Sequence, residues 1–347
     1  MEGIIRRIGA DDKEAFREME ELLIAEGIEL DGNLDYSCGL YDENCRMIGT
    51  GSCFRNTIRC LAVDSGHRGE GLLNVIISHL IEVQTERGNF HLFLYTKPET
   101  ADFMSQLGFY EIARVENKLI FMENRRSGFK NFCSALKKNR IQAERTAAVV
   151  MNANPFTLGH RHLIEKAAAG NDAVHLFILS ENAGPIPPEL RYRFAENGVK
   201  DIPNVICHGT GPYIISSATF PSYFLKDRDT VIRVQAELDL KVFGRIASAL
   251  NIQRRYAGEE RSSRVTGLYN QVMAEKLPEN GVEFVEIPRL ETGGRIISAS
   301  TVRKAIHDGC IESVKDFLPP EEYDYFTGPE GAAVCAAIRN EKDSIHY

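Results

Sequence analysis

The apolar run AAVVM at residues 147–151 is the feature that most constrains the fold of this chain. Because no polar residue interrupts the run, a strand formed from it is buried on both faces. A second apolar segment occurs at 174–179, and residues 205–207, 253–257 and 284–287 are further strand candidates, with helical patterns between them. Apolar strands that alternate with helices predict a parallel sheet with helices packed on both sides.

A different pattern precedes this sheet. Strand patterns at 4–8, 36–41, 47–54, 57–63 and 90–95 occur with helical patterns at 11–26, 72–87 and 101–107. A chain of 347 residues is too long for one ordinary core. We therefore predict a mixed α/β domain over 1–127, a helical connector over 128–145, a parallel-sheet α/β domain over 146–325 and a C-terminal tail over 326–347. The basic run through Lys137, Lys138 and Arg140 is interpreted as the solvated face of the connector helix.

Charge and composition argue against several functions. The formal net charge of −8 and a pI near 5.7 disfavour nucleic acid or anionic membranes as partners, because both need a basic field. The chain has no run of about 18 apolar residues and no apolar signal core, so we expect a cytoplasmic protein. The eight cysteines lack zinc or iron–sulfur spacing, so we expect reduced, structural cysteines and no metal site.

The loop after the first strand of the parallel sheet has residues suited to phosphate. Ligands of such sheets bind beyond the carboxyl ends of the strands, where Thr157, Gly159 and His160 begin a helix. Gly159 lets the backbone approach a ligand, the free N–H groups attract an anion, and the other two add a hydroxyl and an imidazole. The other loop residues that we expect to line the site are Asn152, Asn154, Pro155 and Phe156.

A second helix start near the C-terminal end strengthens this prediction, since a single histidine at a helix start is usually a cap. Ser298, Ser300 and Thr301 precede Arg303 at the start of a helix predicted to end at Gly309. Capping explains one serine but not the whole cluster, which is suited to the β- and γ-phosphates of a triphosphate. Donors placed this way stabilise charge that develops at an α-phosphate. We predict catalytic roles for Thr157, His160 and Arg303.

Together the two elements resemble nucleotidyltransferases with (His/Thr)-x-Gly-His and Ile-Ser-x-Ser-x-x-Arg motifs. The likeness to one family, citrate lyase ligase, extends over nearly the whole chain. It rests on residues 151–161, 213–216, 218–221, 238–240, 265–266 and 269–270. RGEGLL at 68–73 and LGFY at 107–110 resemble motifs of GNAT-type acetyltransferases. The resemblance implies a GNAT-like mixed α/β domain followed by a Rossmann-like, cytidylyltransferase-like nucleotidyltransferase domain.

The resemblance also implies a reaction. ATP with Mg²⁺, acetate and the prosthetic-group thiol of the citrate lyase acyl carrier protein would give an acetyl thioester, AMP and pyrophosphate, through acetyl-adenylate. Two alternatives stay open. One is a nucleotidyltransferase that passes AMP or CMP to a phosphorylated small molecule, and the other is a non-catalytic regulator that binds a CoA-like ligand.

Further site residues follow from the resemblance alone. Arg191 and Lys226 are candidate phosphate cations, with a surface helix charge and a solvated loop lysine as the alternatives. Asp239 either takes Mg²⁺, orients a basic residue or is structural. Gly258 and Glu259 follow a strand at the nucleotide-facing edge. The loop residues Arg68, Gly69 and Gly71 bind the pyrophosphate of a CoA-like arm or have only a structural role.

Overall fold

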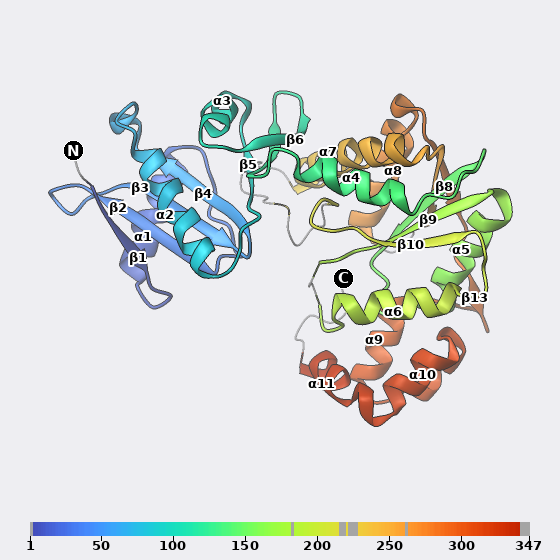
Figure 1. Ribbon diagram of the computed structural model, residues 1–347. Helices are drawn as coiled ribbons and strands as arrows, with labels where there is room; N and C mark the ends of the chain where they lie inside the picture. The colour runs from blue at the N-terminus through green and yellow to red at the C-terminus, as the bar shows by residue number, and fades with distance from the viewer. Residues whose placement is uncertain (1–2, 182–183, 215–219, 221–227, 261–262, 341–347) are drawn as a thin grey trace. The chain divides into compact units, whose positions relative to one another are not determined.

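The computed structural model describes residues 3–181, 184–214, 220, 228–260 and 263–340 (Figure 1). The chain forms two compact units, residues 1–129 with 219–241 and residues 130–218 with 242–347. The first unit thus takes a segment from within the range 146–325 that the sequence pattern assigned to one continuous domain. Residues 228–241 of this segment belong to helix α7 (Arg228–Leu250), which begins in the first unit and ends in the second.

The first unit is a mixed sheet with helices on both faces. Its elements are β1 Ile4–Ile8, α1 Lys13–Ala25, β2 Tyr36–Tyr41, β3 Met47–Phe54, β4 Thr57–Val63, η1 Ser65–His67, α2 Leu72–Glu86, β5 Phe93–Thr96, α3 Pro98–Gln106, β6 Tyr110–Val115 and β7 Leu119–Glu123. The strand order is β1-β2-β3-β4-β5-β7-β6, and only the β4–β5 pair is parallel. The hairpin of β6 and β7 is absent from the sequence-based expectation.

Glycines of β3 allow α2 to pack closely on this sheet. A Cβ built on Gly49 would lie 2.7 Å from Ile76 Cδ1, and one on Gly51 would lie 2.6 Å from Ile76 Cγ2. Ile76 and Leu80 of α2 are fully buried in the core on this side. A separate core on the other side contains Met19 of α1. The missing side chains of β3 therefore set the distance between the helix and the sheet.

The second unit is a parallel sheet covered by helices. Its elements are α4 Gly128–Lys138, β8 Thr146–Met151, α5 Leu158–Gly170, β9 Ala173–Ile178, α6 Pro188–Val199, β10 Val205–Gly209, the end of α7, β11 Arg254–Gly258, α8 Arg264–Lys276, η3 Pro278–Asn280, β12 Glu283–Ile287, the hairpin β13 Glu291–Thr292 and β14 Arg295–Ile296, α9 Ala299–His307, η4 Ile311–Phe317, α10 Pro320–Thr327, η5 Pro329–Gly331 and α11 Ala332–Asn340. The strand order is β10-β9-β8-β11-β12, and every pair is parallel.

The predicted fold class is confirmed: a mixed α/β unit precedes a parallel α/β unit. Successive residues of the central strands face opposite sides of the sheet, as strand geometry requires. Val149 and Leu176 belong to the core that includes residues of α5 and α6. Arg255, on the opposite side, has its guanidinium 4.3 Å from the ring centroid of Phe243 in α7. The strand order reverses between β8 and β11, where ligands of such sheets bind.

The C-terminal residues do not form the predicted tail. Residues 332–340 form α11, and Val334, Cys335 and Ile338 are buried in the core that packs under α5 and α6. The sequence AAVCAAI supplies an apolar face at helical spacing, which gives this segment a reason to dock. Among the helices that the structure describes, none is long and apolar enough to cross a membrane.

The close packing of α2 on β3 leads to a first prediction. We expect Gly51→Ala to lower the free energy of unfolding by about 1–3 kcal/mol, because the added methyl group overlaps Ile76 and Leu80. Urea unfolding followed by circular dichroism measures the change. Gly9→Ala is the matched control, since a Cβ there meets nothing within 4 Å. Equal effects of the two substitutions would contradict this account of the packing.

Candidate functional site

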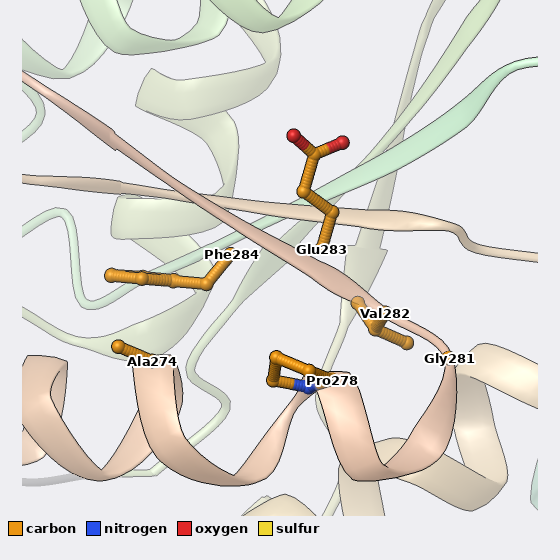
Figure 2. A pocket seen from close by; sticks show the side chains of 6 residues that line it. All are labelled: Ala274, Pro278, Gly281, Val282, Glu283 and Phe284. Carbon is orange, nitrogen blue, oxygen red and sulfur yellow. The ribbon is translucent and has the colours of Figure 1, made fainter.

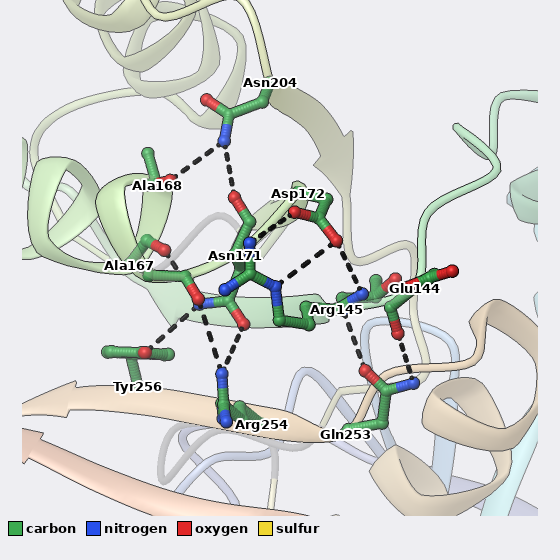
Figure 3. A network of polar contacts seen from close by, with 12 residues as sticks. Glu144, Arg145, Ala167, Ala168, Asn171, Asp172, Asn204, Gln253, Arg254 and Tyr256 are labelled. Carbon is green, nitrogen blue, oxygen red and sulfur yellow. Dashed lines mark hydrogen bonds and ion pairs between the residues drawn. The ribbon is translucent and has the colours of Figure 1, made fainter.

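The amino edge of the parallel sheet is occupied by internal polar contacts (Figure 3). Arg145 Nη2 donates to Asp172 Oδ1 at 2.7 Å, and the Arg145 backbone N–H donates to Asp172 Oδ2 at 3.0 Å. Gln253 Oε1 accepts from the Thr146 backbone at 2.8 Å, and Asn171 Nδ2 donates to the Tyr256 hydroxyl at 3.1 Å. These groups satisfy one another, so we interpret this edge as structural.

An open pocket of about 440 Å³ also lies toward the amino end of β12 (Figure 2). Its lining is mainly apolar, and its one charged residue is Glu283, which pairs with Arg254 at 2.8 Å. A carboxylate repels phosphate, and the lining offers no cation. This pocket is therefore unsuited to phosphate, in contrast to the opposite, carboxyl edge of the sheet.

At that edge Thr157 and His160 form a reciprocal cap at the start of α5. The His160 backbone N–H donates to Thr157 Oγ1 at 3.4 Å, and the Thr157 backbone N–H donates to His160 Nδ1 at 3.1 Å. This is a capping box in which histidine takes the place of the usual glutamate or glutamine. Because Nδ1 accepts a hydrogen bond from a backbone N–H, the proton of the neutral ring is on Nε2.

The surroundings of His160 keep its imidazole neutral. Desolvation by burial and, secondly, the positive charge of Arg289 lower its pKa to about 4. At neutral pH the ring therefore donates from Nε2 without a positive charge of its own. Nε2 has no protein acceptor among the residues that the structure describes, which leaves this donor available to a ligand.

Gly159 joins the two predicted phosphate elements. A Cβ built on Gly159 would lie 2.9 Å from the carbonyl oxygen of Ile297, a backbone atom that cannot easily move. The sequence analysis expected this glycine to make room for a ligand. In the structure the space is taken by the Ile297 carbonyl instead. The glycine lets the start of α5 pack directly against the residue that precedes Ser298.

The Ser298 cluster caps α9 beside this contact. Ser298 Oγ accepts from the Thr301 backbone N–H at 3.1 Å. The same oxygen lies 3.0 Å from Ser300 Oγ and 2.7 Å from Thr301 Oγ1. All three side chains are partly exposed. Three hydroxyls therefore surround one helix N-terminus, next to the N-terminus of α5.

Arg303 is buried beneath the loop and has 1% of its surface exposed. Its Nη1 donates to the Asn154 carbonyl oxygen at 2.6 Å, so the guanidinium ties α9 to the β8–α5 loop. The sequence analysis predicted that Arg303 contacts phosphate directly. Its guanidinium is buried in this structure, so it is not placed for that contact. The Asn154 side chain is also buried, and both its amide atoms lack a hydrogen-bond partner among the described residues.

Arg191 of α6 differs from both sequence-based alternatives, because it is fully buried. It donates from Nη1 to the Asn152 carbonyl oxygen at 2.9 Å and also to Asn152 Oδ1. Nε donates to the Ile186 carbonyl oxygen at 3.2 Å, and Nη2 donates to the Glu181 carbonyl oxygen. Burial lowers its pKa. Arg191 therefore links two loops through hydrogen bonds to their backbone carbonyls. It is neither an exposed phosphate clamp nor a surface charge.

Two further loop residues belong to the core. Phe156 is fully buried, and a Cβ on Gly198 of α6 would lie 2.3 Å from its ring. Its ring also stacks on His160, with centroids 5.7 Å apart. Pro155 is buried as well. Both residues were expected to contact the ligand. In the structure they are buried, and Phe156 packs against the imidazole of His160.

Arg289 is a site residue that the sequence analysis missed. It follows β12, donates from Nε to the Glu259 carbonyl oxygen at 2.7 Å and pairs through Nη2 with Glu260. The Gly258 carbonyl oxygen accepts from Asn270 Nδ2 at 3.0 Å, so the end of β11 is also fixed. The signal was present, because Arg289 stands just past a predicted strand, where the carboxyl-edge rule looks for ligand contacts.

The remaining candidates lie elsewhere. Lys226 falls outside the described residues. Asp239 is buried in α7, within its first-unit segment. In the first unit, Gly69 and Gly71 have positive φ and open space around them, so backbone conformation explains both. Arg68 pairs with Glu26 at 2.5 Å on the surface.

The capping geometry predicts the state of His160. From pH 7.5 down to pH 5 we expect a neutral ring with the proton on Nε2, because its pKa is lowered to about 4 and protonation begins only near that pH. Two-dimensional NMR of the ring nitrogens measures both the charge and the tautomer, and His160→Gln assigns the signal. A cationic ring at pH 6, or a proton on Nδ1, would refute the assignment.

Solved structures resemble parts of the chain only loosely. A protein described as a candidate nicotinate-nucleotide adenylyltransferase from Vibrio parahaemolyticus has 16% identity and a TM-score of 0.37, and the match covers 57% of this chain and 96% of that one. A GNAT family acetyltransferase from Staphylococcus aureus has 16% identity and a TM-score of 0.30 over 35% of this chain and 100% of that one. TM-scores this low carry no functional argument.

Sequence relatives give a definite result. The pattern of the family described as citrate lyase ligase C-terminal domain matches residues 146–326. The citrate (pro-3S)-lyase ligase of Haemophilus influenzae is 36% identical over 88% of this chain and 93% of its own length. The ligase of the same name from Escherichia coli is 34% identical over 91% of each chain. This chain therefore belongs to the citrate lyase ligase family.

Proposed function

We propose that this protein is an ATP-dependent acid–thiol ligase that acetylates citrate lyase. In the first step an acetate oxygen attacks the α-phosphorus of ATP, the bond to the β-phosphate oxygen breaks, and acetyl-adenylate and pyrophosphate form. In the second step the thiol of the carrier's prosthetic group attacks the acetyl carbon. The bond from that carbon to AMP breaks, the thiol proton is released, and AMP leaves.

The observation that carries this proposal is the contact between two helix starts at the carboxyl edge of the sheet. The N-terminus of α5 and the hydroxyl cluster of α9 are held together at Gly159 and Ile297. Each helix start presents free N–H groups and the positive end of a helix dipole to an anion. Two such starts side by side are suited to a polyphosphate, with Mg²⁺ bound to its phosphate oxygens.

His160 and Arg289 add the donors that the first step needs. Negative charge builds on the phosphate oxygens as the carboxylate approaches, and preorganised donors lower the energy of that state. The Nε2–H of a neutral imidazole provides a hydrogen bond, and the nearby Arg289 guanidinium, although paired with Glu260, adds positive charge. Thr157 holds Nδ1 from its backbone and so fixes the direction of the ring.

The family supports the choice of acceptor. The relatives are named as ligases of citrate lyase, and the match extends over most of both chains. In this proposal acetate is the acid and the carrier protein of citrate lyase provides the thiol. A nucleotidyltransferase acting on a phosphorylated small molecule uses the same phosphate donors but does not respond to acetate, so acetate separates the two functions.

Acetate-dependent exchange of radiolabelled pyrophosphate into ATP tests the first step. We expect exchange in the wild type, and a rate lower by about 10²–10³ in His160→Ala, because one preorganised donor is lost. His162→Ala, two residues along the same helix, is the matched control and is expected to keep the wild-type rate. The absence of acetate-dependent exchange in folded wild-type protein would refute the proposed function. An unchanged rate in His160→Ala would show that His160 has no role in the reaction.

A second variant pair tests Arg289. We expect Arg289→Gln to lower the exchange rate on the order of 10²-fold. It is also expected to raise the pKa of His160 from about 4, since the positive charge that disfavours the imidazolium is removed. Arg289→Lys keeps the charge and so is expected to keep the low pKa. The same NMR titration and exchange assay give both readings, and a wild-type exchange rate in Arg289→Gln would contradict a role in the reaction.

A further inference from the structure

The segment around α4 carries an unusual concentration of positive charge. Residues 125–140 contain six basic side chains and no acidic one, although the whole chain has 49 acidic and 41 basic residues. Four of the six belong to the second unit, and we call these four the basic strip: Lys130, Lys137, Lys138 and Arg140. All four are exposed.

Internal ion pairs do not explain the basic strip. No acidic side chain among the described residues pairs with Lys130, Lys137, Lys138 or Arg140, whereas Arg145 just beyond the strip pairs with Asp172 at 2.7 Å. Another exposed cation of the same unit, Lys200, also has an acidic partner, Glu321, at 2.8 Å. The strip therefore keeps its charge unneutralised.

The helix dipole explains only part of the strip. Lys137 and Lys138 stand in the last turn of α4, where cations are favoured. Lys130 stands near the beginning, where an anion is favoured, and the first turn has no acidic residue. A helix selected only for its own stability would place an acid at this end, so Lys130 needs another reason.

The three lysines of the strip lie on one side of α4, and Arg140 lies two residues past its end. Lys130 and Lys137 are seven residues apart and so project from the same side, with Lys138 about 100° further round. Leu136 is buried, and the ring of Phe132 packs on Tyr213 with centroids 5.0 Å apart. The apolar side of α4 therefore anchors it to the second unit, which leaves the lysines facing outward.

The same contacts locate the strip relative to the phosphate site. Phe132 lies against Gly211 and Tyr213, which follow the carboxyl end of β10. Arg140 lines a small pocket with Thr146, the first residue of β8, at the amino edge. The helix thus runs from one edge of the sheet to the other, and Lys130 is at the edge that carries His160.

We propose that the basic strip docks an acidic face of the protein that bears the acceptor thiol, an inference that rests on the proposed function. Complementary charge on a protein surface steers encounter and sets orientation. The overall charge of −8 makes a long nucleic acid a poor partner, because the rest of the surface repels it. A protein with a local acidic face meets the strip without that repulsion.

The test combines one variant with three assays. In the variant, Lys130→Gln, Lys137→Gln, Lys138→Gln and Arg140→Gln remove the strip. We expect acetate-dependent pyrophosphate exchange to stay at the wild-type rate, since exchange needs no carrier. With the carrier protein of citrate lyase, kcat/KM is expected to fall about 10–100-fold at low salt, mainly through KM, and to lose most of its salt dependence. With free dephospho-CoA as the thiol, the rate is expected to be unchanged, because this small thiol has no protein surface to dock on the strip.

A second variant controls for net charge. Lys13→Gln, Arg17→Gln, Lys166→Gln and Arg339→Gln remove four exposed basic residues elsewhere, none of which pairs with a described acid. We expect this control to keep wild-type kinetics with the carrier protein. An equal loss in both variants, or no loss in the strip variant, overturns the docking surface.

Two further outcomes are distinguishable. If the strip variant loses binding to a labelled single-stranded oligonucleotide while its carrier kinetics stay normal, the strip is a nucleic-acid surface and the proposal is wrong. If the wild type shows no acetate-dependent exchange, the proposed function fails first, and the docking surface fails with it.

Discussion

The contact between Gly159 and the Ile297 carbonyl is the constraint on which the candidate site depends. It brings together residues far apart in the chain, and any side chain at position 159 would push the start of α5 away from the Ser298 cluster. Backbone atoms on one side and a helix N-terminus on the other leave little room for adjustment. The distance between the two phosphate-binding elements is therefore set by the absence of one methyl group.

Buried arginines hold this arrangement from behind. Arg303 ties α9 to the Asn154 carbonyl, and Arg191 ties α6 to Asn152 and to the segment before it. A buried guanidinium is costly unless its N–H groups find acceptors, and carbonyl oxygens of the site loops provide them here. The loops thus gain rigidity from charges that never face the ligand. The positive field at a bound phosphate is expected to come instead from the helix ends and from Arg289, which Glu260 partly neutralises.

Much of the fold could be predicted from local sequence pattern. The five strands of the parallel sheet and the helix after Thr157 lie within a few residues of their expected positions, because strand patterns and capping residues are local signals. The hairpin of β6 and β7 and the helix α11 were missed. Their formation depends on distant partners, since Cys335 and Ile338 become apolar contacts only once the core under α5 exists.

The site shows the same division between local and distant information. Thr157, Gly159, His160 and the Ser298 cluster were predicted because helix starts are legible in sequence, and the structure places them together. The orientation of each arginine could not be predicted from the sequence, because the burial of its side chain depends on tertiary packing. Arg303 and Arg191 turn inward, while Arg289 reaches the end of β11 and affects His160. A sequence names the cations near a phosphate, but packing decides which of them keep their charge available. In this protein Arg289 pairs with Glu260 and still lowers the pKa of His160, so the site presents a neutral imidazole, two helix ends and a guanidinium that Glu260 partly neutralises.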